Sequence, residues 1–178
     1  MDWICNSSYS FDDENFRKIF DFYVLKTPVN HVSYRGINLK KRNIRNYKML
    51  YTEMKKRLSS STFNHFIYIY DGQKIEEEII KNGIVNFHDE NVQESNEIFE
   101  YAIYKVLPKY TEGSSFFYLI RCALAHGSFC IHEYKNEKYY YFLNYHKNTL
   151  NGKKIIDARM CIKEKTLLEI IKYCDLKI

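Results

Sequence analysis

Apolar side chains recur at helical spacing along most of the first two-thirds of the chain. A repeat of three to four positions is typical of an amphipathic helix with one buried face. The expected helices cover residues 12–26, 43–58, 63–81 and 92–107. We expect the third of them to break near Asp71-Gly72 and the fourth to stop at Pro108, because proline cannot continue a helix.

The segment 115–126 predicts the most apolar helix of the chain. We expect it to begin at Ser114, which can cap a helix through its hydroxyl, and to end at Gly127, a residue that readily adopts a left-handed conformation. Its side chains leave no wide polar face, and a helix that is apolar nearly all round is normally buried.

The pattern changes after Gly127 to short apolar and aromatic runs that are typical of strands. The expected strands are Phe129–Tyr134, Lys138–Tyr145 and Lys154–Ile162, with turns at Lys135-Asn136-Glu137 and near Asn151-Gly152. A last helix is expected over residues 167–175, where Thr166 and Glu169 have the spacing of a capping box.

These patterns predict one mainly α domain over residues 1–178. Its helical part covers about 10–127, and a small antiparallel β-ribbon with a final helix covers about 128–178. Two prolines, six glycines and the absence of any repeat or linker indicate no domain boundary. The 17 tyrosines and 12 phenylalanines supply a core and also rings suited to a partner surface.

Charge and cysteine content narrow the expected environment. A net charge of +5 permits a nucleic-acid partner without demanding one. The number of cysteines, five, is odd, and no two of them form a CxxC motif. The N-terminus lacks the features of a secretory signal. We therefore expect a cytoplasmic protein with free thiols. No apolar run is long enough to span a bilayer, and we expect no membrane association.

Arg121 and His126 are the candidate functional pair. Arg121 is the only formally charged residue between Gly113 and His132. Burial of a guanidinium group is unfavourable unless it pairs with an anion, so we expect Arg121 to have an anionic partner or ligand. His126 follows five positions later, about 140° further round an ideal helix, and the two side chains can flank one shallow cleft. The small side chains of Ala123 and Ala125 would let a second copy of the helix approach closely and complete this cleft.

The sequence RCALAHGSF (residues 121–129) resembles the R-x4-H signature of the HEPN family. These domains are helical bundles that often dimerise, and many are ribonucleases of toxin–antitoxin, abortive-infection and CRISPR systems. The resemblance implies a homodimeric, metal-independent endoribonuclease that needs no cofactor, with an antitoxin or another protein as a possible further partner. The family favours Asn, Asp or His after the arginine, whereas this chain has Cys122.

The chemistry implied by this resemblance starts from the RNA's own 2′-OH. His126 would act as general base or acid, and Arg121 would stabilise charge on the phosphoryl oxygens. The products would be a 2′,3′-cyclic phosphate and a 5′-hydroxyl. A HEPN module that binds RNA or a protein without cleavage is the alternative favoured by Cys122. A helical interaction protein with a tyrosine-rich surface is a third.

Three other interpretations compete for the same residues and for the basic segment. Arg121 could be structural, paired with Glu97 or Glu100. A zinc site could use Cys122, His126, Cys130 and His132, although their spacing matches no familiar zinc motif. The densest basic stretch could follow an RNA backbone or simply be a solvated helix face; its RNA-binding candidates are Lys40, Lys41, Arg42 and Arg45. His146 shows no partner pattern and is interpreted as a surface or satisfied core residue.

Overall fold

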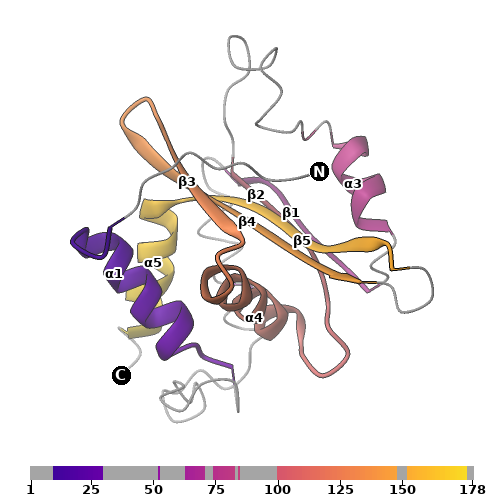
Figure 1. Ribbon diagram of the computed structural model, residues 1–178, viewed down its shortest axis with the longest axis horizontal. Coiled ribbons are helices and arrows are strands. Elements are labelled where there is room, and N and C mark those ends of the chain that lie inside the picture. Colours follow the sequence, from indigo (N-terminus) through magenta and orange to yellow (C-terminus); the bar gives the residue numbers. More distant parts are fainter. Residues whose placement is uncertain are drawn as a thin grey trace.

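The computed structural model describes residues 10–29, 52, 63–70, 74–82, 84, 100–147 and 152–175. Its elements are α1 (Glu14–Phe20), the π-helix η1 (Asp21–Leu25), β1 (Phe63–Ile69), α3 (Ile75–Lys81), β2 (Glu100–Lys105), α4 (Glu112–Ala125), β3 (Phe129–Tyr134), β4 (Glu137–Lys147), β5 (Lys154–Lys163) and α5 (Glu164–Asp175). The strands form one five-stranded sheet in the order β1-β2-β5-β4-β3 (Figure 1).

The sheet is mixed, with one parallel pair and three antiparallel pairs. β1 runs parallel to β2, and α3 lies between them in the sequence, as expected for a parallel connection. The C-terminal ribbon supplies β3, β4 and β5, which pair antiparallel, and β5 also pairs antiparallel with β2. The last strand of the ribbon is therefore the central strand of the whole sheet.

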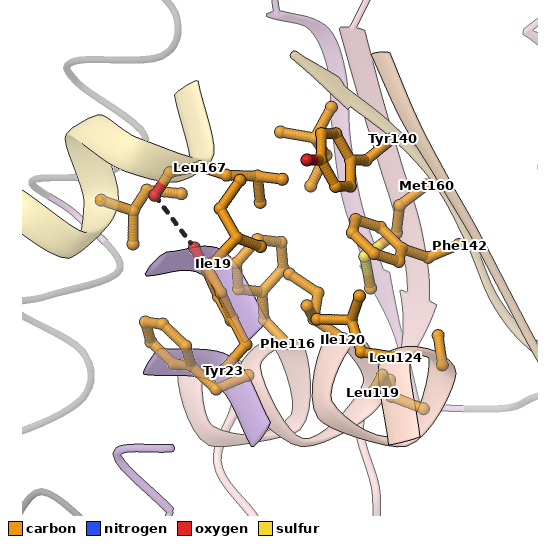
Figure 2. Close-up of a cluster of buried hydrophobic side chains, with 14 of the residues drawn as sticks. Ile19, Tyr23, Phe116, Leu119, Ile120, Leu124, Tyr140, Phe142, Met160 and Leu167 are labelled. Atoms are coloured by element: carbon orange, nitrogen blue, oxygen red, sulfur yellow. Dashed lines mark hydrogen bonds between the residues drawn. The ribbon is translucent and has the colours of Figure 1, made fainter. Parts of the chain in front are cut away.

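One face of the sheet carries the main core. Helices α1, α4 and α5 and the π-helix η1 pack there against alternate residues of the strands. Phe116 and Ile120 of α4 lie against Phe142 and Met160 of the sheet in Figure 2. Tyr23 is fully buried in the same cluster, and its hydroxyl donates to the carbonyl oxygen of Leu167 at 3.4 Å, which joins η1 to α5.

The opposite face of the sheet is covered in part by α3. Its buried residues Ile75 and Ile79 belong to a second cluster with Ile103 of β2 and Cys161 of β5. Three tyrosines of the sheet, Tyr101, Tyr139 and Tyr141, also belong to this cluster. Because both faces are covered, β2, β4 and β5 each contain a run of consecutive buried residues.

The prediction of a mainly helical, HEPN-like bundle is wrong. Residues 63–69 and 100–105 form strands β1 and β2, where helices were expected over 63–81 and 92–107. Only the end of the first segment is helical, as α3. The burial of all residues from Glu100 to Tyr104 explains the error, since a strand covered on both faces lacks the alternation that distinguishes strands from helices. The expected helix at 43–58 lies outside the described residues, apart from Thr52.

The C-terminal elements were predicted closely. All three ribbon strands are present, and the turn between β3 and β4 places Lys135 and Asn136 at φ 50° and 62°, the signs that a tight type I′ hairpin requires. The last helix begins at Glu164, three residues before the expected start, directly from the end of β5. No helix in the described ranges is both long and apolar enough to cross a membrane.

Candidate functional site

Helix α4 carries the candidate pair and begins earlier than expected. Its N-cap is Thr111 rather than Ser114, and the Thr111 side chain accepts the backbone N–H of Ser114 at 3.3 Å. The Ser114 hydroxyl in turn accepts the backbone N–H of Thr111 at 2.7 Å, which completes a capping box. Ser114 is thus the third residue of the helix, and Glu112 occupies its first turn.

The C-terminal end of α4 is fixed by Gly127, as predicted. Gly127 has a φ of +69°, and its N–H donates to the Leu124 carbonyl at 3.5 Å. The Ser128 N–H donates to the Ala123 carbonyl at 2.8 Å. Together these bonds form the Schellman motif that ends a helix through a left-handed residue. His126 is the C-cap residue, and the chain turns away immediately after it.

The solvent-facing residues of α4 from Tyr118 onward lie on one stripe. They are spaced three or four positions apart, so they share a single side of the helix. We call this set the α4 stripe: Tyr118, Arg121, Cys122, Ala125 and the C-cap His126. Ala123 is fully buried in the core, so the expectation that it would admit a second helix is wrong. Arg121 and His126 are separated by about 7.5 Å along the helix axis.

Arg121 is half-buried and has no carboxylate partner within the described part of the chain. Its Nε is buried without a hydrogen bond. Glu100, one expected partner, is itself buried, and its Oε1 accepts the backbone N–H of Lys163 at 2.8 Å. Glu97 lies outside the described residues. Among the side chains that are described, then, the guanidinium charge is not neutralised by an acid.

Tyr118 links the stripe to a second ring. Its side chain stacks on Tyr110, with ring centroids 4.9 Å apart. A hydrogen bond with the Cys122 thiol is the main cause that raises the pKa of the Tyr118 hydroxyl, with partial burial adding to it and the Arg121 charge opposing it. The raised pKa keeps the hydroxyl protonated to a higher pH, and its partner Cys122 lies next to Arg121 in the sequence.

The expected zinc ligands do not gather. Cys122 and His126 lie on the outer side of α4, Cys130 is buried in β3, and His132 is exposed on the same strand. No group of three or more His, Cys, Asp or Glu residues in the described ranges has the arrangement of a metal site. The four residues therefore do not form the tetrahedral set that structural zinc requires.

The basic candidates Lys40, Lys41, Arg42 and Arg45 lie outside the described residues. The structure instead reveals an arrangement that the sequence analysis missed. The Nδ1 of His146 lies 2.8 Å from Oδ2 of Asp157, and Lys105 Nζ lies 4.0 Å from the other oxygen of that carboxylate. The contact joins residues eleven positions apart through the β4–β5 pairing, so only a correct register could have revealed it.

Comparison with known proteins identified no relative of this chain. No protein-family model, no curated protein and no solved structure matches this chain. The site has to be interpreted from its own residues.

Proposed function

We propose that the α4 stripe acts on RNA and cleaves its phosphodiester backbone without a metal ion. The observation that carries this proposal is the half-buried Arg121, whose charge has no acidic partner among the described residues and whose Nε is a buried donor without an acceptor. A phosphate group supplies both the missing charge and the missing acceptor, and arginine binds it through several donors at once. The exposed His126 lies about 1.4 turns further along the helix, at the other edge of the same stripe.

The reaction follows from the RNA itself. An imidazole removes the proton of the 2′-OH, the 2′ oxygen forms a bond to phosphorus, and the bond from phosphorus to the 5′ oxygen breaks. The leaving 5′ oxygen takes a proton from an acid, and the products are a 2′,3′-cyclic phosphate and a 5′-hydroxyl. Arg121 stabilises the charge that grows on the phosphoryl oxygens. In a two-fold dimer, a second copy of the stripe supplies a second imidazole, so that one acts as base and the other as acid.

This proposal keeps the chemistry of the R-x4-H segment but not the HEPN-like bundle, because the structure has a mixed sheet instead. An isolated helix can present the same two side chains on another scaffold, because function depends on the site and not on the fold. The setting implied by the resemblance, a toxin or phage-defence effector with an antitoxin or another protein partner, stays a prediction.

The direct test is cleavage of labelled single-stranded RNA of mixed sequence in EDTA. The parent protein should cleave, whereas Arg121→Met and His126→Gln should each lose at least about a hundredfold in rate, as for loss of one charge-stabilising or proton-transfer group. Arg17→Met on α1 and His132→Gln on β3 are the matched controls, since both side chains are exposed away from α4. Equal cleavage by parent and Arg121→Met would refute the proposal.

A second candidate function is RNA binding without cleavage. The hydrogen bond between Tyr118 and Cys122 favours this function. A Cys122 side chain that bonds to Tyr118 does not orient Arg121 and His126 for catalysis. Cys is also a weak hydrogen-bonding group. In this case the parent binds RNA and leaves it intact, while Arg121→Met weakens binding. Replacement of Cys122 by Asn, the residue type that the resembled family uses, would then be the change most suited to produce cleavage.

A further inference from the structure

The loop end of the β4–β5 ribbon, where β4 ends and β5 begins at the right of Figure 1, concentrates positive charge. Lys147 and Lys154 are directly paired across the two strands, and Lys153 precedes Lys154. Directly opposed side chains in an antiparallel pair have Cβ atoms about 5 Å apart, and like charges at that spacing destabilise the pair. No carboxylate of the described residues lies within ion-pair distance of Lys147 or Lys154. The pairing is therefore not explained by the stability of the ribbon.

An aromatic ring holds one of these lysines in place. The Nζ of Lys154 lies 4.6 Å from the centroid of the Tyr145 ring, within the range of a cation–π contact. Tyr145 is 45% exposed, so the ring and the ammonium group share an open surface. A bulge between Asn144 and Tyr145 shifts the register just before this point. Bulges of this kind re-aim the side chains that follow them.

The one carboxylate of the described ribbon end is already occupied. Asp157 contacts His146 on one oxygen and Lys105 on the other, at 2.8 Å and 4.0 Å. Its side chain is 13% exposed, against 44% for His146. Both oxygens of this acid are therefore engaged by groups other than Lys147 and Lys154. Lys147 and Lys154 are thus left with no acid to neutralise them among the described residues of the ribbon.

We propose that the loop end of the β4–β5 ribbon, formed by Tyr145, Lys147 and Lys154, binds the sugar-phosphate backbone of RNA. A polyanion removes the repulsion between Lys147 and Lys154, and the Tyr145 ring offers a face on which a base can stack. This inference rests on the proposed function in one respect, that RNA is the ligand. It does not require that the α4 stripe cleaves the RNA.

An RNA ligand fits this surface better than an anionic membrane. Binding to a bilayer surface uses exposed apolar side chains beside the lysines. The strongly exposed aliphatic and phenyl side chains of the described residues are Phe11, Leu25 and Ile80, and none belongs to β4 or β5. Tyr145 is the sole large hydrophobic side chain that is strongly exposed within the described part of this ribbon.

The test is the binding of a fluorescent single-stranded RNA by the full-length protein, followed by anisotropy across a range of salt concentrations. To keep the RNA intact, all proteins carry His126→Gln. The double substitution Lys147→Gln with Lys154→Gln should weaken binding about tenfold or more at low salt. It should also lower the slope of log affinity against log salt by about 1.4, the value for two phosphate contacts with a single strand. Tyr145→Ala should weaken binding by a smaller factor.

The matched control is Lys165→Gln with Lys172→Gln on the exposed side of α5, which changes the net charge equally. It should leave the affinity within about twofold and the salt slope unchanged. Thermal unfolding of each variant checks that the fold is retained. Equal effects of the two double substitutions, or binding of the parent to phosphatidylserine vesicles and not to RNA, would overturn the proposal. Normal binding by the ribbon variants with loss of binding in Arg121→Met would overturn it too, while leaving the proposed function standing.

Discussion

The backbone N–H of Ser128 donates to the carbonyl oxygen of Ala123 at 2.8 Å, and this bond closes the end of α4 around its C-cap residue His126. It can form only because the intervening Gly127 adopts a φ of +69°. The position of the His126 backbone is therefore fixed by a glycine that makes no chemical contribution of its own. Ser128 also connects this end of the helix to β4, since its carbonyl oxygen accepts the N–H of Leu143 at 3.0 Å.

Replacement of Gly127 by Ala should destabilise the protein by about 1 kcal/mol, because an L-residue in the left-handed region is strained. A Cβ at this position would meet nothing within 4 Å, so the cost is conformational and not steric. We also expect slower cleavage of RNA, since relief of the strain moves His126. Gly152→Ala is the control: it has a φ of +67° with equally open surroundings, and it should cost similar stability without slowing cleavage at saturating RNA. Urea unfolding and cleavage rates measure the two effects.

Arg121→Met should leave the stability unchanged or raise it by up to about 1 kcal/mol. The Nε of Arg121 is a buried donor with no acceptor, and such a donor carries a desolvation cost that an apolar side chain of similar length avoids. A structural arginine would behave in the opposite way, since removal of a buried ion pair is strongly destabilising. A fall in the free energy of unfolding by more than about 1 kcal/mol, measured with urea, would therefore mean that Arg121 serves the fold.

The helix α4 was predictable because its signals are local. A wholly apolar segment, an arginine within it and a glycine after it can all be recognised without knowledge of the fold. The ribbon was predictable for the same reason, since its strands are consecutive and joined by a short turn. The N-cap was assigned to Ser114 because two residues able to cap, Thr111 and Ser114, stand three positions apart, and the capping box uses both.

Strands β1 and β2 were not predictable from spacing alone. Phe63, Phe66, Ile67 and Tyr70 match a helical period as well as a strand. Their richness in aromatic and β-branched residues was the signal in favour of a strand. The parallel pairing of β1 with β2 depends on contacts between distant segments, which no local pattern encodes. The contact of His146 with Asp157 was missed for the same reason, because a bulge sets the register between the two strands.

Asp13 should make stability fall as the solution is acidified. Its carboxylate caps α1 by accepting the N–H groups of Asn15 and Phe16 and pairs with Lys138, and the Lys138 hydrogen bond is the main cause that lowers the Asp13 pKa. A lowered folded-state pKa means that the stabilisation is present above pH of about 4 and is lost as the pH falls through the folded value. Asp13→Ala should cost about 1 kcal/mol at neutral pH.

Asp13→Asn is the control for the charge, because an amide oxygen still caps the helix. It should be nearly as stable as the parent at low pH and less stable at neutral pH, as measured by urea unfolding at the two values. If Asp13→Asn shows the same loss of stability on acidification as the parent, the pH dependence arises elsewhere.

Cys161 should resist alkylation in the native protein. It lies on β5, the central strand of the sheet, and is fully buried; burial raises the pKa of its thiol to about 12, although the hydrogen bond with Tyr141 partly offsets this. At pH 8 only about one thiol in ten thousand would be the reactive thiolate. Because the thiol pKa is higher in the folded protein than in the unfolded chain, where it is about 8.5, Cys161 contributes its full stabilisation below a pH of about 8.5. This contribution is lost as the pH rises toward the folded-state pKa of about 12. Iodoacetamide treatment with peptide mass mapping should therefore modify the half-buried Cys122 well before Cys161, and urea should abolish the difference. Modification of Cys161 at the rate of Cys122 in the folded protein would show that the sheet opens to solvent at its centre.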